Sequence, residues 1–263
     1  MTQPAVSRQV QTLERQLGVP LFERNRRAVV LTEAGRQLLQ DAVGLLAYAD
    51  ATSRRVQRIA RGGNRLVVGF RSGLTLTSAI RRFSDVQPDV TIETRRIEWD
   101  EQESALLGGQ VDIAYVRRPI DEQGLELIPL FTEPRLAALP VRHPLAYSRS
   151  LTVAEIASER HLRYLESAGA GTTRAPLRSV EEKLEFVASG EGIIVLPQSA
   201  TIHYTRPDIT YVPLSDAEPD EVLLAWPSSR RSQLLTIFID SAKSAILSTD
   251  PAGISAEGMA THL

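Results

Sequence analysis

Four polar side chains near the start of the chain fall on one face of an expected helix. Gln3, Ser7, Arg8 and Gln11 lie opposite the apolar positions that recur at helical spacing up to Leu17. Amide, hydroxyl and guanidinium groups form hydrogen bonds with base edges and phosphates in double-stranded DNA. This face therefore predicts a DNA-contacting surface.

An arginine-rich tip follows that helix. Two short apolar stretches flank Arg24, Arg26 and Arg27, which favours a small hairpin that presents three guanidinium groups. The alternative is a solvated turn between helices. Residues 1–61 contain ten Arg and five acidic residues, a net charge of +5; the whole chain carries −2, so the rest carries −7. A basic end on an acidic body indicates a nucleic-acid-facing segment joined to a domain with another role.

A second group of candidate residues follows the expected strands of the remaining chain. Ligands of open α/β sheets bind beyond the carboxyl ends of strands, and arginines beside a helix N-terminus favour an anion. We expect a small, anionic ligand to contact Arg71, Ser72, Gly73, Thr75, Arg117, Glu166, Ser167 and Pro197. The alternative is that Arg117 and Arg118 are surface residues paired with Asp121 or Glu122.

The types of residue exclude several classes of chemistry. The chain has no cysteine, so disulfides, thiol catalysis and thiolate metal sites are excluded. Its four histidines are scattered without the spacing of metal ligands. No nucleophile, base and acid group together along the sequence. We therefore expect neither an enzyme nor a bound metal or cofactor.

Length and composition indicate a globular protein of about two domains. The 263 residues are 43% apolar and 24% charged, which is enough to build a core. The N-terminus has no apolar segment of a signal peptide, and the apolar run Ile193–Leu196 is far too short to cross a bilayer. The absence of cysteine fits a reducing compartment. These features predict a cytoplasmic protein without membrane contact.

A long helix is expected over residues 33–61, after Thr32 as its capping residue. Apolar and small residues alternate along it by four and three, which is a heptad seam. The alternative is an amphipathic helix packed against its own domain. The seam predicts pairing with a second helix through Leu38, Ala42, Leu45, Ala49, Val56 and Ile59.

The remaining residues alternate between strand and helix patterns, which favours an α/β fold with a parallel-rich sheet. Ser179 and Glu182 form a capping-box pattern before one helix. Strands are expected at Leu66–Phe70, Val90–Ile97, Val111–Val116, Leu125–Leu130, Leu136–Pro140, Leu162–Leu165, Ile193–Leu196, Ile209–Val212 and Val222–Trp226. Helices are expected at Thr77–Val86, Glu101–Leu107, Val153–Ala157, Val180–Ala188, Gln198–Tyr204 and Ser232–Leu247.

The stretch TQPAVSRQVQTLERQLGVPLFERNRRAVVLTEAG resembles the second half of the winged helix-turn-helix of LysR-type transcriptional regulators. The resemblance implies that residues 1–32 hold the recognition helix and the wing. It also implies which residues meet DNA. The major groove would be contacted by Gln3, Pro4, Ala5, Ser7, Arg8 and Gln11, and phosphates by Arg24, Arg26 and Arg27.

The family pattern starts roughly 30 residues earlier, with two helices that this sequence lacks. We expect either that the start codon has been placed too late or that the gene is truncated and its product is impaired in DNA binding. The intact wing and linker favour the first explanation.

The segments RLVVGF, ALLGGQVDIAYV and VEEKLEFVASGEGIIVLPQS resemble the effector-binding domain of the same family. The resemblance implies the two-subdomain fold of type 2 periplasmic binding proteins and an antiparallel pairing of linker helices into a homodimer or tetramer. Crossings are expected near Leu136–Pro140 and Val222–Trp226. The expected parts are residues 65–140 with 227–248, residues 141–226, and a disordered tail at 249–263.

These observations predict a regulator that binds promoter DNA under the control of a small effector in the cleft between subdomains. The alternative is an effector-binding, dimerising protein that has lost DNA binding through truncation. An extracytoplasmic solute-binding protein would share the fold, but it would need neither the arginine-rich wing nor the heptads.

Overall fold

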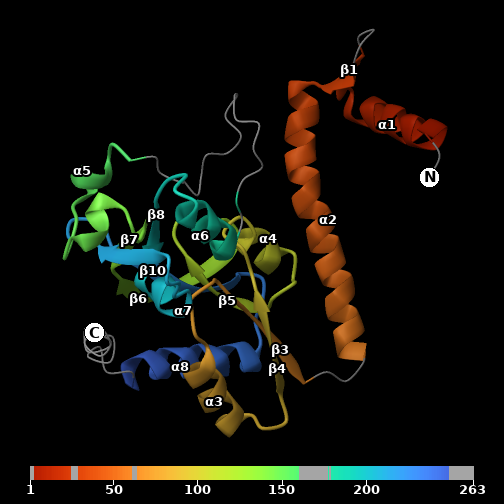
Figure 1. Cartoon of the computed structure of the whole chain (residues 1–263). Coiled ribbons are helices and arrows are strands. Elements are labelled where there is room, and N and C mark those ends of the chain that lie inside the picture. Colours follow the sequence, from red (N-terminus) through yellow and green to blue (C-terminus); the bar gives the residue numbers. More distant parts are fainter. Residues whose placement is uncertain (1–2, 25–28, 61–63, 160–176, 178, 249–263) are drawn as a thin grey trace.

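The computed structural model describes residues 3–24, 29–60, 64–159, 177 and 179–248. Figure 1 shows a helix with a small hairpin, then a long helix, then a body of helices and strands. The strand expected at Leu162–Leu165 and the tail at 249–263 fall outside the described residues.

The N-terminal part contains a helix and a hairpin: α1 (Gln3–Leu17), β1 (Phe22–Arg24) and β2 (Val29–Leu31). The expected hairpin is confirmed, because β1 and β2 pair antiparallel. Glu14 attaches α1 to the hairpin, since its Oε1 accepts hydrogen bonds from the backbone N–H groups of Leu21 (2.8 Å) and Phe22 (3.2 Å). The orientation of α1 relative to the wing is thus fixed by a side chain within α1.

The long helix α2 (Glu33–Ala60) begins where the sequence predicts. Thr32 caps it, because its Oγ1 accepts a hydrogen bond from the Gly35 N–H (2.9 Å) and donates one to the Pro20 carbonyl (2.8 Å). The helix runs beside the body and contacts α4 (Gln102–Leu107) (Figure 1). None of the helices in the described ranges is long and apolar enough to span a membrane.

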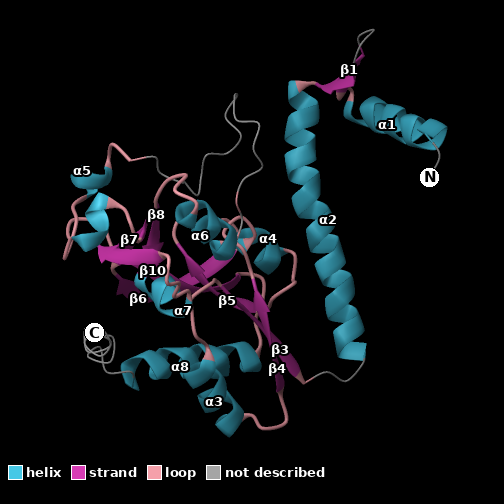
Figure 2. Cartoon of the chain, viewed as in Figure 1, coloured by secondary structure: helices cyan, strands magenta, loops and turns pink. Residues whose placement is uncertain are grey.

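The first sheet of the body has five strands in the order β4-β3-β5-β10-β6 (Figure 2). The strands are β3 (Arg65–Phe70), β4 (Thr91–Arg96), β5 (Ile113–Arg117), β6 (Leu125–Glu133) and β10 (Asp220–Pro227). Only β3 makes parallel pairs, with β4 and β5; β10 is antiparallel to β5 and β6. The expected parallel-rich sheet is mixed, because β10 lies between β5 and β6 and runs antiparallel to both.

Helices cover both faces of this sheet, and alternate strand residues face each layer. Leu66 and Val68 pack with α3 and α8, whereas Val67 between them packs with α4. This alternation follows from the two-residue period of a strand. The covering helices are α3 (Thr77–Val86), α4 (Gln102–Leu107) and α8 (Gln233–Ser248).

The second sheet has three antiparallel strands in the order β8-β7-β9. They are β7 (Arg135–Pro140), β8 (Ile194–Pro197) and β9 (Ile209–Pro213). Two helices, α6 and α7, pack on one face, while η1 and α5 pack on the other. Their bounds are η1 (Pro144–Tyr147), α5 (Val153–Ile156), α6 (Val180–Ala188) and α7 (Gln198–His203). The capping box of Ser179 and Glu182 is present at the start of α6.

We call the part built on the five-stranded sheet lobe I and the part built on the three-stranded sheet lobe II. The chain leaves lobe I at Pro134, between β6 and β7, and returns through residues 214–219 before β10. The crossings expected near Leu136–Pro140 and Val222–Trp226 fall in the strands beside these two passages, β7 and β10.

Candidate functional site

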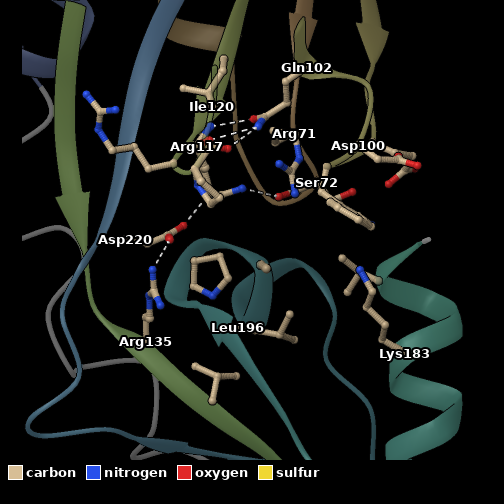
Figure 3. Close-up of a pocket in the computed structure, with 18 of the residues that line it drawn as sticks. Arg71, Ser72, Asp100, Gln102, Arg117, Ile120, Arg135, Lys183, Leu196 and Asp220 are labelled. Atoms are coloured by element: carbon tan, nitrogen blue, oxygen red, sulfur yellow. Dashed lines mark hydrogen bonds and ion pairs between the residues drawn. The ribbon is translucent and has the colours of Figure 1, made fainter. Parts of the chain in front are cut away.

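A cavity of about 980 Å³ lies between the lobes (Figure 3). Lobe I contributes the segments that follow β3, β4 and β5, the first residues of α4, and the start of β10. Lobe II contributes β7, α5, α6, β8 and α7. Because both lobes line it, the shape of the cavity depends on how the lobes are arranged.

The rule that ligands bind beyond the carboxyl ends of strands predicts part of this cavity lining. Arg71, Ser72, Arg117 and Pro197 line it. Gly73 and Thr75 do not belong to its lining. Glu166 and Ser167 lie outside the described residues. Of the four residues expected after β3, Arg71 and Ser72 thus line the cavity, whereas Gly73 and Thr75 do not.

Gly73 has a different role, as the point where the lobes touch. Its φ is +85°, which favours glycine, and a Cβ at this position would lie 2.6 Å from the backbone N and Cα of Ala200 in α7. The loop after β3 can approach α7 this closely only without a side chain. Gly73 thus sets the distance between the lobes beside the cavity.

Arg117 lies in the cavity wall within a buried network of charged and polar groups. Its side chain is only 6% exposed and forms ion pairs with Glu133 (2.8 Å) and Asp220 (2.8 Å). It also donates hydrogen bonds to the Ser72 carbonyl (3.1 Å) and to Ser199 Oγ (2.7 Å). Its charge is thus balanced inside the protein. Arg117 thus links lobe I to Ser199 of lobe II at the cavity wall, and its expected contact with an anionic ligand stays a prediction.

The same cluster joins the two lobes at their crossings. Glu133 ends β6 and Asp220 begins β10, so the two carboxylates flank the passages between lobes. Glu133 accepts hydrogen bonds from the backbone N–H (2.6 Å) and Oγ (3.0 Å) of Ser199, at the start of α7. Burial raises the pKa of Asp220, while Arg117 and Arg135 oppose that rise.

Arg118 next to it is a surface residue, as the alternative from the sequence proposed. Its Nη1 pairs with Glu122 (2.8 Å) and its Nε with Glu221 (2.7 Å), and about half of its side chain is exposed. Glu122 was one of the two expected partners. Arg117 is the last residue of the buried strand β5 and Arg118 follows it outside the strand, so these adjacent arginines have opposite environments.

Sequence reasoning missed Lys183, which lines the cavity from α6. The residue is only 3% exposed, and its pKa is lowered to about 8, first by burial and then by the charge of Arg71. Glu98 and Asp100 act in the opposite direction. The rule about strand ends does not consider residues on helices, so it did not predict Lys183. A lysine among the apolar residues that form the buried face of α6 could have indicated it.

Two hydrogen-bonding groups of the cavity wall have no partner among the described residues. These are the Ser72 hydroxyl and the Trp99 indole N–H, and both atoms are buried. Ser72 is 8% exposed. Buried polar groups in proteins are nearly always hydrogen-bonded, so such orphaned groups in a cavity wall indicate a place where a ligand binds.

The predicted DNA-contacting residues occupy α1 and the hairpin. Arg8 and Gln11 are exposed, and Ser7 is partly exposed. Gln3, Pro4 and Ala5 are in the first turn of α1, and Arg24 ends β1, but their side chains are not described. Arg26 and Arg27 lie outside the described residues. The described part of the predicted surface is thus solvent-facing.

The expected pairing seam lies along α2. Leu45 is 68% exposed and Val56 is 62% exposed, and Ala49 is exposed as well. Leu38 and Ala42 are partly buried, and the side chain of Ile59 is not described. The helix contacts α4 of its own chain and still presents apolar seam residues to solvent. No group of acidic residues and histidines in the described ranges could hold a metal ion.

The family model described as "LysR substrate binding domain" matches residues 62–246, and "Bacterial regulatory helix-turn-helix protein, lysR family" matches residues 1–36. The chain is 31% identical to the HTH-type transcriptional regulator BudR of Raoultella terrigena, over 91% of this chain and 90% of BudR. It is 30% identical to the regulator YnfL of Escherichia coli K12, over 86% of this chain and 84% of YnfL.

Solved structures show the same arrangement of domains. Full-length BenM matches with a TM-score of 0.57 and 26% identity, over 93% of this chain and 88% of that one. Full-length CbnR complexed with its target DNA matches in fold, with a TM-score of 0.55 and 22% identity, over 94% and 91%. These relatives are transcriptional regulators rather than enzymes, and a chain without DNA binding is not favoured. The chain therefore belongs to the LysR family of transcriptional regulators, in which a helix-turn-helix is joined to an effector-binding domain.

Proposed function

We propose that this regulator contacts promoter DNA through α1 and the β1–β2 hairpin, and that a small anionic effector in the cavity between lobes modulates that contact. The cavity carries this proposal, because it lies between two lobes and its wall holds the orphaned Ser72 hydroxyl. A protein that binds a promoter acts in the cytoplasm, where bacterial DNA is.

The effector acts by differential affinity for two arrangements of the lobes. A ligand changes a conformational equilibrium only to the extent that it binds one state better than the other. A molecule that contacts both walls of the cavity meets this condition, since moving the lobes breaks one set of its contacts. The contact between α2 and α4 supports transmission of such a change to the linker helix.

Arg8 is expected to contribute to sequence-specific DNA binding. An Arg8→Ala change should weaken binding to the promoter region beside the protein's own gene by about 1–3 kcal/mol, as expected for a bidentate contact with a base. A mobility-shift titration with specific and unrelated DNA measures this loss.

Arg15→Ala is the matched control for this experiment. Arg15 lies on the same helix, but its Nε bonds the Gln11 carbonyl (3.3 Å) and its Nη2 bonds Thr12 Oγ1 (3.0 Å). Its replacement should change the specific affinity little. Equal effects of the two changes would remove Arg8 from the proposed base contacts.

The α2 seam is expected to pair two copies of the chain. A Leu45→Asp change would place a charge in the paired seam and should raise the dimer dissociation constant on the order of 100-fold. Sedimentation velocity over a concentration series measures the shift to monomer. Leu46 is equally exposed, at 68%, but lies off the seam, so Leu46→Asp is the control. A dimer that survives Leu45→Asp unchanged would place the interface elsewhere.

A further inference from the structure

The two passages of the chain between the lobes lie toward one edge of the sheet of lobe I. Its strands have the order β4-β3-β5-β10-β6 (Figure 2). One passage leaves the end of β6, at Glu133, and the other enters the start of β10, at Asp220. Strand β4 forms the opposite edge, three strand spacings from β10, which is roughly 14 Å. The chain thus connects the lobes on the side of the sheet that is remote from β4.

The start of α7 in lobe II contacts lobe I on the side of these passages. The Ser199 N–H donates a hydrogen bond to Glu133 (2.6 Å), and the Ser199 hydroxyl accepts one from Arg117 (2.7 Å). Next to them, Ala200 lies against Gly73, as described above. We call the contact region of Gly73, Glu133, Ser199 and Ala200 the junction. Contacts close to an axis of rotation change little in length, so a rotation of lobe II with its axis at the junction would preserve them.

Another contact between the lobes lies at the opposite edge of the sheet. Arg96 is the last residue of β4, and Glu181 lies in the first turn of α6 in lobe II. Nη1 of Arg96 is 3.3 Å from Oε1 of Glu181. Because β4 is remote from the strands that carry the passages, a rotation about the junction would separate Arg96 from Glu181 and leave the bonds of Ser199 in place.

Each member of this ion pair is also held by groups of its own lobe. Arg96 pairs with Glu98 of lobe I through Nη2 (3.0 Å). Burial lowers the pKa of Arg96, but the charges of Glu98 and Glu181 outweigh this effect and the pKa is raised. Burial opposes the ionisation of Glu181, whereas its own backbone N–H and Arg96 favour it, and its pKa is lowered. The hydroxyls of Ser179 and Tyr204 in lobe II contribute to this lowering. Both side chains therefore stay charged, and the pair can form again after it has broken.

The ion pair lies immediately outside the cavity. Glu98 and Lys183, each two residues along the chain from a member of the pair, line the cavity. Arg96 and Glu181 themselves do not belong to its lining. Separation of the pair would therefore widen the cavity without removing a side chain from its wall.

We propose that the Arg96–Glu181 ion pair is a latch that holds the two lobes in a closed arrangement, and that its release lets lobe II rotate about the junction and opens the cavity on the side of β4. An exposed ion pair contributes little to the stability of a fold, yet a small free energy is enough to change the ratio of two arrangements that are close in energy. This inference rests on the proposed function for its regulatory meaning, since it names the contact that biases the arrangement of the lobes.

Distances between two spin labels, measured by double electron–electron resonance on the full chain, test the latch. The chain has no cysteine, so labels attach only to introduced ones. We choose Ser84→Cys on α3 of lobe I and Ser189→Cys after α6 of lobe II, both at exposed positions. An excess of unlabelled chain suppresses distances between copies. Arg96→Glu places like charges opposite each other and should raise the ratio of long to short distances at least about twofold. An unchanged distance distribution overturns the inference.

Charge reversal distinguishes a latch from a merely structural effect. Arg96→Glu combined with Glu181→Arg restores opposite charges across the lobes and should return the distribution toward that of the parent chain. Arg65→Glu is the matched control, because Arg65 pairs with Glu93 (2.6 Å) within lobe I and the two side chains are similarly exposed, at 41% and 45% against 44% and 52% for the latch. Circular dichroism confirms that each variant is folded. An equal shift in Arg65→Glu, or no return in the double variant, contradicts the latch.

The proposed function can fail separately from this inference. The spin-label distances are measured without DNA and without an effector, so they report on the latch alone. The proposed function fails when a molecule bound in the cavity leaves the promoter affinity unchanged in the mobility-shift assay. Lobes that open in Arg96→Glu while the promoter affinity ignores every bound molecule would support the latch and overturn the proposed function.

Discussion

Replacement of Arg117 by Met is expected to lower the free energy of unfolding by about 3–5 kcal/mol. The change leaves Glu133 (5% exposed) and Asp220 (9% exposed) without the guanidinium that lies 2.8 Å from each. Removal of one partner from a buried ion pair is costly because it leaves an uncompensated charge in the interior. Urea denaturation at pH 7 measures the loss.

The pH dependence of this loss has a definite sign. Without Arg117, burial and the charge of the nearby Glu133 should raise the pKa of Asp220 in the folded state further above its value of about 4 in the unfolded chain. The folded variant then binds more protons than its unfolded form, so its stability falls as the pH rises through that window. The difference from the parent protein should widen between pH 4 and pH 7.

Arg118→Met is the matched control. This arginine follows Arg117 directly, but its pairs with Glu122 and Glu221 are largely exposed, and solvent-exposed ion pairs contribute little to the free energy of unfolding. Equal losses for the two substitutions would show that the buried cluster does not stabilise the fold as we infer.

The second large effect is expected for Gly73→Ala, which should lower the free energy of unfolding by about 2–4 kcal/mol. A left-handed conformation disfavours a side chain by roughly 1–2 kcal/mol, and overpacking typically adds about 1–3 kcal/mol. Here the added methyl would meet backbone atoms of Ala200 at 2.6 Å, and a backbone cannot swing aside as a side chain does. The loop after β3 and α7 must therefore separate.

Gly190→Ala measures how much the left-handed backbone conformation alone contributes to the loss of stability. Gly190 has a similar φ of +77°, but a Cβ there would meet nothing within 4 Å. Thermal unfolding of both variants should show a loss of about 1 kcal/mol for Gly190→Ala and a clearly larger loss for Gly73→Ala. Similar losses would mean that the lobes are free to move apart at Gly73.

Local patterns predicted the elements well, because periodicity is a property of neighbouring residues. The helix at Thr77–Val86 and the helix at Val180–Ala188 have the bounds that the sequence indicated. The order of strands was harder to predict. The antiparallel position of β10 depends on where the chain returns from lobe II, and that return is set by the packing of distant segments.

The candidate site was predicted in part for the same reason. Arg71, Ser72 and Pro197 follow strands, so a rule about strand ends finds them. The neutralisation of Arg117 depends on Asp220, which is remote in sequence and has no motif that announces the pairing. Lys183 reaches the cavity from a helix of the other lobe, which a strand-based search does not examine.

The short helix α4 lies between the buried charge cluster around Arg117 and the long helix α2. Gln102 in its first turn accepts a hydrogen bond from the Arg117 N–H (2.8 Å) and donates to the Arg117 and Pro119 carbonyls (3.1 and 3.3 Å), so one end is fastened to the buried charge cluster. The same six-residue helix touches α2. A displacement of the cavity wall that moves α4 therefore also pushes the long helix α2 sideways.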